Sequence, residues 1–413
     1  MLLTVALTIA SLSLGIWLFL LGFWGGFWRC DQRLVERETQ PALGTQAITG
    51  HSTLPPVAIV VPARNEADVI AQSVHSLLSQ TYSTPLTVIL VDDQSEDGTA
   101  AIAQATATEL QAQGHRLEVL SGQPLPTGWT GKLWALEQGT QYAQTLEPQP
   151  QYLLLTDADI LHPPTNVEQL VTKAAAEGLA LTSLMVQLRC ETFWERVLIP
   201  AFIFFFQKLY PFPWVNNVNR PIAAAAGGCI LIRRDVLERL DGIQVVREAL
   251  IDDCSLAAAV KFRDPALKPD QQPRWNKIWL GLSQATLSLR EYPDLDSVWT
   301  MVARTAYTQL RYSPLLLFGT LLGMSLVYLA APVGLLCGLL WQNPALIAVT
   351  ATTWLLMAIA YIPTLTLYRQ SPLFGFALPG IALLYTLMTL DSARRHWQGK
   401  GGAWKGRVYS SAG

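Results

Sequence analysis

Long uncharged stretches lie near both ends of the chain, and a central region carries shorter apolar runs. Residues 1–28 contain no charged side chain, and about 20 apolar residues suffice to cross a bilayer. Nothing basic precedes this stretch, and it closes on an aromatic group made of Phe23, Trp24, Phe27 and Trp28. The pattern predicts an uncleaved transmembrane anchor over 1–28 rather than a cleaved signal peptide.

Basic residues follow the anchor directly, at Arg29, Arg33 and Arg37. Because the cytoplasmic flanks of membrane helices are enriched in Lys and Arg, the chain beyond the anchor is predicted to be cytoplasmic. Residues 29–56, rich in Thr, Gly, Pro and Ala from position 38, are predicted to form a linker.

The hydrophobic pattern changes between residues 57 and 313. Short apolar runs at 57–61, 86–91, 152–156 and 179–186 alternate with helix-like stretches at 66–79, 99–113, 132–145 and 166–177. Such alternation is typical of βαβ units around a mostly parallel sheet, so we predict an α/β domain over 57–313. In such folds ligands bind at the carboxyl ends of the strands.

One phenylalanine-rich segment within this region does not fit the alternation. Residues 197–210 are apolar but too short to span a bilayer. The segment is either a helix buried in the core or a helix lying in the membrane interface.

Three further uncharged runs, at 315–340, 345–367 and 372–390, predict a C-terminal transmembrane region over 314–391. Their lack of ionisable residues argues against a transporter. Residues 392–413 form a basic tail, and three full spans starting in the cytoplasm would leave that tail outside. We therefore predict a cytoplasmic tail and one re-entrant or split segment.

Two of the runs are candidates for that irregular segment. Residues 372–390 are short and contain Pro372 and Pro379, whereas 315–340 is interrupted at Pro332.

The composition agrees with a membrane protein that has a sizeable water-soluble part. Of the 413 residues, 51% are hydrophobic and 15% charged, against roughly 25% charged in an ordinary soluble domain. This balance excludes an intrinsically disordered chain, and a net charge of −2 provides no basic field for nucleic acid. The five scattered cysteines form no CxxC pair, so neither a zinc site nor a disulfide framework is expected.

Two polar clusters follow the first two predicted strands. Pro62-Ala63-Arg64-Asn65-Glu66 comes directly after the first, and Asn65 is a candidate cap for the next helix. The second strand ends in Asp92-Asp93-Gln94-Ser95-Glu96-Asp97-Gly98-Thr99. Adjacent carboxylates beyond a buried strand are costly unless something binds them, although a solvated acidic loop is the alternative.

The third cluster, Asp157-Ala158-Asp159, also follows an apolar strand. Two carboxylates one residue apart can hold Mg²⁺ or Mn²⁺ together with diphosphate oxygens.

The fourth cluster, Asp252-Asp253, lies in a largely apolar stretch. A partly buried carboxylate there would have a raised proton affinity and could act as a general base; an N-cap pair for the next helix is the alternative.

In this order, PARNE, VDDQSEDGT, LTDAD and IDDCSLA resemble the family 2 glycosyltransferases with the GT-A nucleotide-sugar fold, over residues 56–312. Gly131-Lys132, with Ala135 and Gly139, looks like that family's GKxxA…G stretch. Stretches such as GWTGKLWAL and MVARTAYTQLRYS further resemble the bacterial membrane glycosyltransferases associated with hopanoid biosynthesis.

The resemblance implies a role for each motif residue. The nucleotide pocket would be formed by Pro62, Glu66, Asp92, Asp93 and Lys132. Asp157 would face the ribose and diphosphate, Asp159 would bind the metal ion, and Asp253 would deprotonate the acceptor hydroxyl, with inversion at the anomeric carbon.

One motif departs from the family pattern. Many membrane members carry Q/RxxRW near the diphosphate, whereas this chain has Thr308-Gln309-Leu310-Arg311-Tyr312. Arg311, or Arg304 before it, remains the candidate for the leaving diphosphate, since guanidinium suits phosphate. The departure argues against processive polymer synthesis.

The hydropathy pattern predicts a multi-pass membrane protein with a cytoplasmic soluble domain. The resemblance further implies a bacterial inner-membrane enzyme that transfers a sugar from a nucleotide sugar, UDP-linked in preference to GDP-linked, to a lipid acceptor. The alternatives are a polyprenyl-phosphate sugar or polysaccharide synthase on the same fold, and a non-catalytic scaffold that binds nucleotide sugars.

Overall fold

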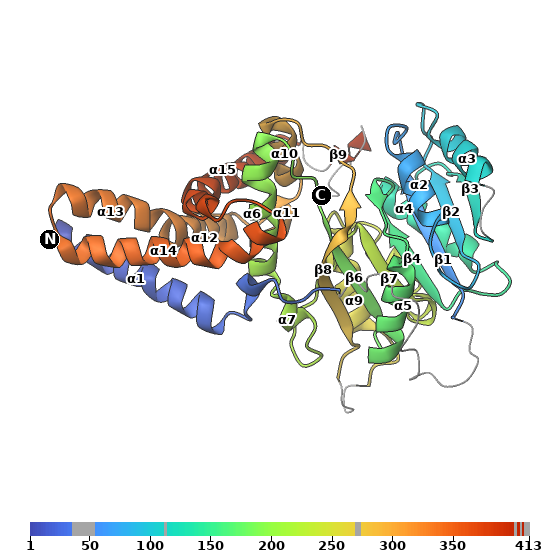
Figure 1. The fold of residues 1–413 in the computed structure, drawn as a ribbon, viewed down its shortest axis with the longest axis horizontal. Coiled ribbons are helices and arrows are strands. Elements are labelled where there is room, and N and C mark those ends of the chain that lie inside the picture. Colours follow the sequence, from blue (N-terminus) through green and yellow to red (C-terminus); the bar gives the residue numbers. More distant parts are fainter. Residues whose placement is uncertain (35–53, 111–113, 269–273, 400–402, 405–406, 409–413) are drawn as a thin grey trace. The chain divides into compact units, whose positions relative to one another are not determined.

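A computed structural model describes residues 1–34, 54–110, 114–268, 274–399, 403–404 and 407–408. The chain forms two compact units (Figure 1). The first contains residues 1–31, 189–213 and 291–413, and the second contains 32–188 and 214–290. Residues 189–213 and 291–313, which lie inside the predicted 57–313 domain, thus belong to the helical first unit. Most of the predicted linker and Lys400 and Lys405 of the tail lie outside the described residues.

The second unit is built on one eight-stranded sheet of order β3-β2-β1-β4-β7-β6-β8-β5. Its strands are β1 (Val57–Ala63), β2 (Thr87–Asp92), β3 (Arg116–Ser121), β4 (Tyr152–Thr156), β5 (Ile160–Leu161), β6 (Leu181–Gln187), β7 (Cys229–Arg233) and β8 (Ile278–Ser288). The β3-β2-β1-β4 half and the β6–β8 pair are parallel, whereas β7 runs antiparallel to β4 and β6. The predicted α/β class and the mostly parallel sheet are confirmed.

Helices of this unit connect and cover the strands. They are α2 (Ile70–Leu78), α3 (Thr99–Leu110), α4 (Gly131–Ala143), α5 (Asn166–Glu177), α8 (Arg234–Arg239), the 3₁₀ turn η2 (Gly242–Val246) and α9 (Asp252–Arg263). β1, β2 and β4 are almost wholly buried, as expected for parallel strands covered on both faces. The alternation of apolar runs and helical stretches located β1, β2, β4 and β6 and the helices α2 to α5, but β3, β5, β7, β8, α8 and η2 were not predicted.

The first unit is helical. Its elements are α1 (Leu2–Phe23), η1 (Phe27–Arg29), α6 (Phe193–Leu209), α10 (Leu295–Ala303), α11 (Ala306–Gln309), α12 (Pro314–Met324), the π-helical segment η3 (Ser325–Leu329), α13 (Ala330–Leu340), α14 (Pro344–Leu367), η4 (Pro372–Ala377) and α15 (Leu378–Trp397). The short helix α7 (Phe212–Val215) follows α6, and β9 (Ala403–Trp404) pairs with β10 (Arg407–Val408).

Five helical stretches among the described residues are long and apolar enough to cross a membrane: Leu2–Phe23, Phe193–Val215, Pro314–Leu340, Pro344–Leu367 and Pro372–Trp397. The expectation that the phenylalanine-rich segment is too short to span is corrected, because its helix begins at Phe193 and the apolar stretch continues through α7 to Val215. A capping box fixes that start: the Thr192 side chain accepts from the Glu195 N–H, and the Glu195 carboxylate accepts from the Thr192 N–H.

Much of the apolar surface of this unit has no protein neighbour. α1, α13 and α14 lie side by side (Figure 1), yet only 17% of the most apolar part of α1 is buried. Leu336, Leu339 and Leu340 on α13 are more than half exposed. Exposed apolar area of this extent is typical of a surface covered by lipid, which agrees with a membrane protein.

Candidate active site

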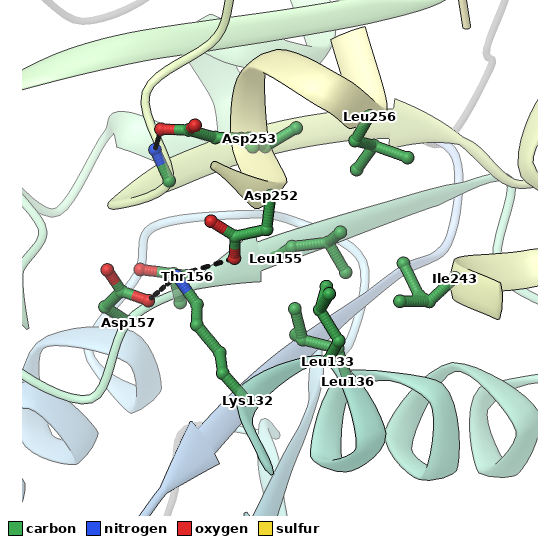
Figure 2. Close-up of a pocket in the computed structure, with 12 residues that line it drawn as sticks. Lys132, Leu133, Leu136, Leu155, Thr156, Asp157, Ile243, Asp252, Asp253 and Leu256 are labelled. Atoms are coloured by element: carbon green, nitrogen blue, oxygen red, sulfur yellow. Dashed lines mark hydrogen bonds and ion pairs between the residues drawn. The ribbon is translucent and has the colours of Figure 1, made fainter. Parts of the chain in front are cut away.

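A pocket opens in the second unit where strand β4 ends. Polar groups from three elements form one side of it and aliphatic side chains form the other (Figure 2). The lining residues are Lys132, Leu133, Leu136, Leu155, Thr156, Asp157, Gly227, Ile230, Ile243, Asp252, Asp253 and Leu256. Three motifs that are far apart in the sequence thus meet in one place.

Lys132 links two of these motifs. It is the second residue of α4, whose N-terminus is capped by the Thr130 side chain. Its Nζ lies 2.7 Å from Asp157 Oδ1 and 3.3 Å from Asp252 Oδ2 (Figure 2). Burial of Lys132 disfavours its charge, but Asp157 and Asp252 outweigh that effect and raise its pKa. Burial also raises the pKa of Asp157, against the attraction of Lys132.

Asp253 points into the same pocket from the first turn of α9 (Figure 2). Its Oδ2 accepts from the Gly227 N–H at 3.0 Å and its Oδ1 accepts from its neighbour Cys254 N–H at 2.7 Å. Burial and the nearby Asp252 raise the pKa of Asp253 to about 6. α9 begins at Asp252 with Ile251 as N-cap, so the alternative of an Asp252-Asp253 N-cap pair is excluded. A carboxylate with this proton affinity suits general-base chemistry near neutral pH.

The first two sequence clusters are joined to each other by hydrogen bonds. The Asn65 N–H donates to Ser95 Oγ and the Glu96 N–H donates to Asn65 Oδ1, each at 2.9 Å. Asn65 does not cap a helix, which corrects the expectation, because α2 begins only at Ile70. Its side chain instead holds the acidic loop after β2, and its backbone has φ +50°.

The predicted nucleotide residues lie at the adjoining ends of β1 and β2. Pro62 pairs in register with Val91, and Asp92 is the last residue of β2. Asp93 is 2% exposed, and its carboxylate lies 3.8 Å from the Arg64 guanidinium. Within the described part of the chain, Asp92 Oδ1 is buried without a hydrogen-bond partner. Such an oxygen is a candidate acceptor for a ligand.

Asp159 and Glu66 are joined by an arginine that the sequence analysis did not identify. Arg290 Nε lies 2.9 Å from Asp159 Oδ2, and its Nη2 lies 3.1 Å from Glu66 Oε1. The only sequence signal for this contact is a basic residue just after the strand 278–288, and that strand was not predicted.

A buried histidine supports the loop that carries Asp157. Thr156 Oγ1 donates to the Gly228 carbonyl at 2.8 Å and contacts His162 Nε2 at 2.9 Å, and Asn166 Nδ2 lies 2.8 Å from His162 Nδ1. Because the Asn166 amide is a donor, Nδ1 must accept and the ring is neutral, with its proton on Nε2. Burial lowers the pKa of His162 to about 3.

The carboxylates of Asp157 and Asp159 each have one oxygen in a salt bridge. Asp157 uses Oδ1 for Lys132 and Asp159 uses Oδ2 for Arg290, and within the described residues no hydrogen bond engages their other oxygens. Among those residues, no group of three or more His, Cys, Asp or Glu could hold a metal ion. Mg²⁺ is usually bound by one or two carboxylates plus substrate phosphates, so this donor set fits a cation that arrives with a diphosphate.

The predicted diphosphate arginines lie in the first unit. Arg304 is the C-cap of α10, and Arg311 follows α11 with φ +52°. The second unit thus brings Lys132, Asp157 and Asp253 together in one pocket without them.

Residues 58–241 match the family model described as glycosyl transferase family 2. This stretch, less than half of the chain, is similar to family 2 glycosyltransferases. A curated relative, glycosyltransferase AglE of Haloferax volcanii, is 41% identical over 58 residues, which cover 14% of this chain and 19% of that protein. The chain therefore matches only about a fifth of the length of that relative.

A solved structure resembles almost the whole chain. The mannosyltransferase PcManGT from Pyrobaculum calidifontis, in complex with GDP-Man and Mn²⁺, aligns over 96% of this chain and 99% of its own. Its TM-score is 0.51 and its sequence identity 16%. At this identity the likeness establishes the fold, the GT-A arrangement of sheet and helices.

Proposed function

We propose that the protein is a membrane-bound inverting glycosyltransferase that moves a sugar from a nucleotide sugar to a lipid hydroxyl. The observation that carries this proposal is the placement of Asp253 in one pocket with Lys132 and Asp157. A carboxylate of raised proton affinity then lies beside the groups expected to bind the donor. The match to family 2 over 58–241 supports the same reaction class.

Each group has a defined task in this reaction. Glu66, Asp92 and Asp93 bind the nucleoside at the ends of β1 and β2, with Pro62 shaping the turn. Asp253 takes the proton of the acceptor hydroxyl, whose oxygen bonds to the anomeric carbon as the bond to the diphosphate breaks. Lys132 keeps Asp157 oriented toward the ribose and diphosphate.

A divalent cation, Mg²⁺ or Mn²⁺, would be held by Asp159 and Asp157 together with diphosphate oxygens. When bound, it offsets the charge that develops on the departing nucleoside diphosphate. The cation that accompanies GDP-Man in PcManGT is Mn²⁺, which supports this assignment. A UDP-sugar remains the proposed donor, and GDP-mannose belongs in any test panel.

A lipid acceptor is supported by the exposed apolar surface of the first unit and by the sequence resemblance to hopanoid-associated glycosyltransferases. The acceptor would then reach the enzyme from the bilayer, and the activity would be linked to hopanoid biosynthesis in the inner membrane of a bacterium.

Sheet pairing restricts how the chain crosses the membrane. β6 and β7 are neighbours in one sheet, with Ser183 opposite Ile230, and α6 lies between them in sequence. A single crossing by α6 would put the two strands on opposite sides of the bilayer. We infer that α6 lies in the membrane interface, despite a length and hydropathy that would allow it to span.

We infer that the segment after α14 returns to the side from which it starts. Gly375 of η4 packs on Ala358, where a Cβ would come within 2.9 Å of the Ala358 carbonyl oxygen. Ala358 lies nine residues before the end of α14, about 14 Å along the helix and half of a 30 Å hydrocarbon layer. α15 then leads back, since the Tyr307 N–H, just before α12, donates to Ser392 Oγ at 3.0 Å.

We therefore propose three crossings, by α1, by α12 to α13, and by α14, with 368–397 re-entrant. Under this proposal the irregular segment is 372–390 rather than 315–340. It keeps Arg29, Arg369, Arg394 and Arg395 on the cytoplasmic side, as the positive-inside rule requires.

The activity is tested with the detergent-purified full-length protein and Mg²⁺ or Mn²⁺. Release of UDP or GDP from a panel of nucleotide sugars is followed with and without total membrane lipid, for the wild type and for Asp253→Asn. Lipid-stimulated release from one donor that is lost in Asp253→Asn supports the proposal. Metal-dependent nucleotide binding without release from any donor would contradict it and favour a non-catalytic scaffold.

A further inference from the structure

We propose that Arg290 binds the diphosphate of the donor. In the donor-free enzyme its guanidinium lies between Glu66 and Asp159 and compensates their negative charge, as the cation does when the donor is bound. This inference rests on the proposed function, because it adds a residue to the same site. It assigns the diphosphate arginine to the second unit, whereas the sequence motif pointed to Arg311 or Arg304.

The backbone fixes Arg290 beside Asp159. Ile160 of β5 pairs in register with Ser288 of β8, and the Leu289 N–H donates to the Asp159 carbonyl at 2.7 Å. The Arg290 N–H in turn donates to Ser288 Oγ at 3.3 Å. These contacts already fix the backbone of the loop at residues 288–290. The ion pairs of the Arg290 side chain are therefore not needed to hold that loop in place.

The two carboxylates are far less exposed than the arginine that joins them. The side chains of Asp159 and Glu66 are 9% and 11% exposed, whereas that of Arg290 is 40% exposed. An ion pair this open to solvent contributes little stability. Nearly buried carboxylates, however, are costly without a compensating positive charge. Arg290 therefore compensates the charge of two nearly buried carboxylates while its own side chain remains accessible to a ligand.

The charges leave room for both a cation and a donor. Glu66, Asp159 and Arg290 together carry a net charge of −1. A divalent cation at Asp159 would change this to +1, which an anionic diphosphate then balances. The solvent-facing guanidinium would lie beside that diphosphate, and its planar fork matches phosphate oxygens better than an ammonium does.

This position gives Arg290 a role in transfer. As the acceptor oxygen bonds to the anomeric carbon, the bond from that carbon to the diphosphate breaks and its electron pair stays on the diphosphate oxygen. The acceptor proton goes to Asp253. Hydrogen bonds from Arg290 to the leaving diphosphate stabilise the added negative charge.

The test compares the wild type with Arg290→Gln, Arg290→Lys and the control Arg233→Gln, all as full-length protein in detergent. Arg233 is matched to Arg290, because it is also 40% exposed and pairs with a carboxylate, that of Asp235. Mn²⁺ binding without donor is measured by electron paramagnetic resonance, UDP and GDP binding by calorimetry with saturating Mn²⁺, and turnover by nucleoside diphosphate release.

Arg290→Gln should bind Mn²⁺ about tenfold more tightly without donor, because two carboxylates lose their internal cation. Its nucleoside diphosphate affinity should fall about tenfold and its kcat/KM about a hundredfold, since a donor to the leaving group is lost. Arg290→Lys keeps the charge, so its Mn²⁺ affinity should stay within about threefold of the wild type while turnover still falls about tenfold. Arg233→Gln should change none of these quantities.

Unchanged or weaker Mn²⁺ binding by a folded Arg290→Gln would overturn the inference. Should that variant fail to fold, wild-type turnover in Arg290→Lys would overturn it instead. A wild type that releases nothing from any donor contradicts the proposed function, whereas tighter Mn²⁺ binding by Arg290→Gln would still support the pairing of Arg290 with Asp159.

Discussion

At the scale of single residues, the surroundings of a carboxylate decide its chemistry. Asp252 and Asp253 are adjacent in sequence, yet Asp252 pairs with Lys132 while Asp253 accepts two backbone N–H groups. Burial and the charge of Asp252 raise the pKa of Asp253 to about 6. The raised proton affinity expected from an apolar stretch is thus present, whereas the Gly227 N–H contact could not be predicted.

The pKa of Asp253 predicts a pH dependence of turnover. A general base must be deprotonated, so kcat/KM should fall about tenfold between pH 7 and pH 5. In Asp252→Asn the repulsion that raises the pKa is removed, and the midpoint should move to lower pH. Initial rates of nucleoside diphosphate release across pH 5 to 8 test both. A profile that stays flat down to pH 5 would argue against Asp253 as the base.

His162 predicts how stability depends on pH. Its pKa is about 3 in the fold and about 6.5 when unfolded, so the unfolded chain binds more protons between these values. The neutral buried ring contributes its full stabilisation above pH 6.5, and this stabilisation is lost as the pH falls toward 3. At pH 5 the free energy of unfolding has decreased by about 2 kcal/mol on this account. The thermal unfolding midpoint should drop less from pH 7 to pH 5 in His162→Gln than in the wild type. Equal drops would contradict the neutral buried ring.

At the scale of elements, close packing of α4 on the sheet positions Lys132. Gly139 faces β1 and β2, where a Cβ would come within 2.3 Å of Val60 Cγ1 and 3.1 Å of Val91 Cγ2. The helix can approach the strands this closely only because position 139 lacks a side chain. The sequence showed a glycine in a helical stretch, but the reason for it lies in strands that are 40 to 80 residues away.

Gly139→Ala should therefore destabilise the protein by about 1–3 kcal/mol, because an added methyl group overpacks the helix–sheet contact. It should also lower turnover, since Lys132 moves with α4. The matched control is Gly15→Ala on α1, where a Cβ would meet nothing within 4 Å. Thermal unfolding of both variants checks this, and equal midpoints would show that the contact relaxes at little cost.

At the scale of the whole molecule, sheet pairing and helix packing restrict the membrane topology. By hydropathy and length, the stretches that contain α6 and α14 and the 372–397 segment are all candidate membrane spans. Only the pairing of β6 with β7 and the contact of Gly375 with Ala358 distinguish them. Both are contacts between residues distant in sequence, so a window along the chain cannot detect them.

The proposed topology predicts which positions react with a membrane-impermeant maleimide in intact cells. In a cysteine-free background, Gln342→Cys between α13 and α14 should be labelled from outside. Glu191→Cys and Asn219→Cys, which flank α6, and Gln398→Cys after α15 should be labelled only after permeabilisation. External labelling of Gln398→Cys would mean that 372–397 crosses fully, and external labelling of either α6 flank would contradict the interfacial helix.

The sequence by itself determined the α/β class, the apolar helices and the acidic motifs at strand ends. These follow from local composition and from the periodicity of apolar residues, which the chain carries independently of its tertiary contacts. Only the tertiary structure shows the pairing of Arg290 with Asp159 and Glu66. It alone also provides the contacts on which the proposed interfacial α6 and the proposed re-entrant 368–397 segment rest. Each depends on strands or helices brought together across long loops, and charge compensation and close packing act only once those elements are adjacent.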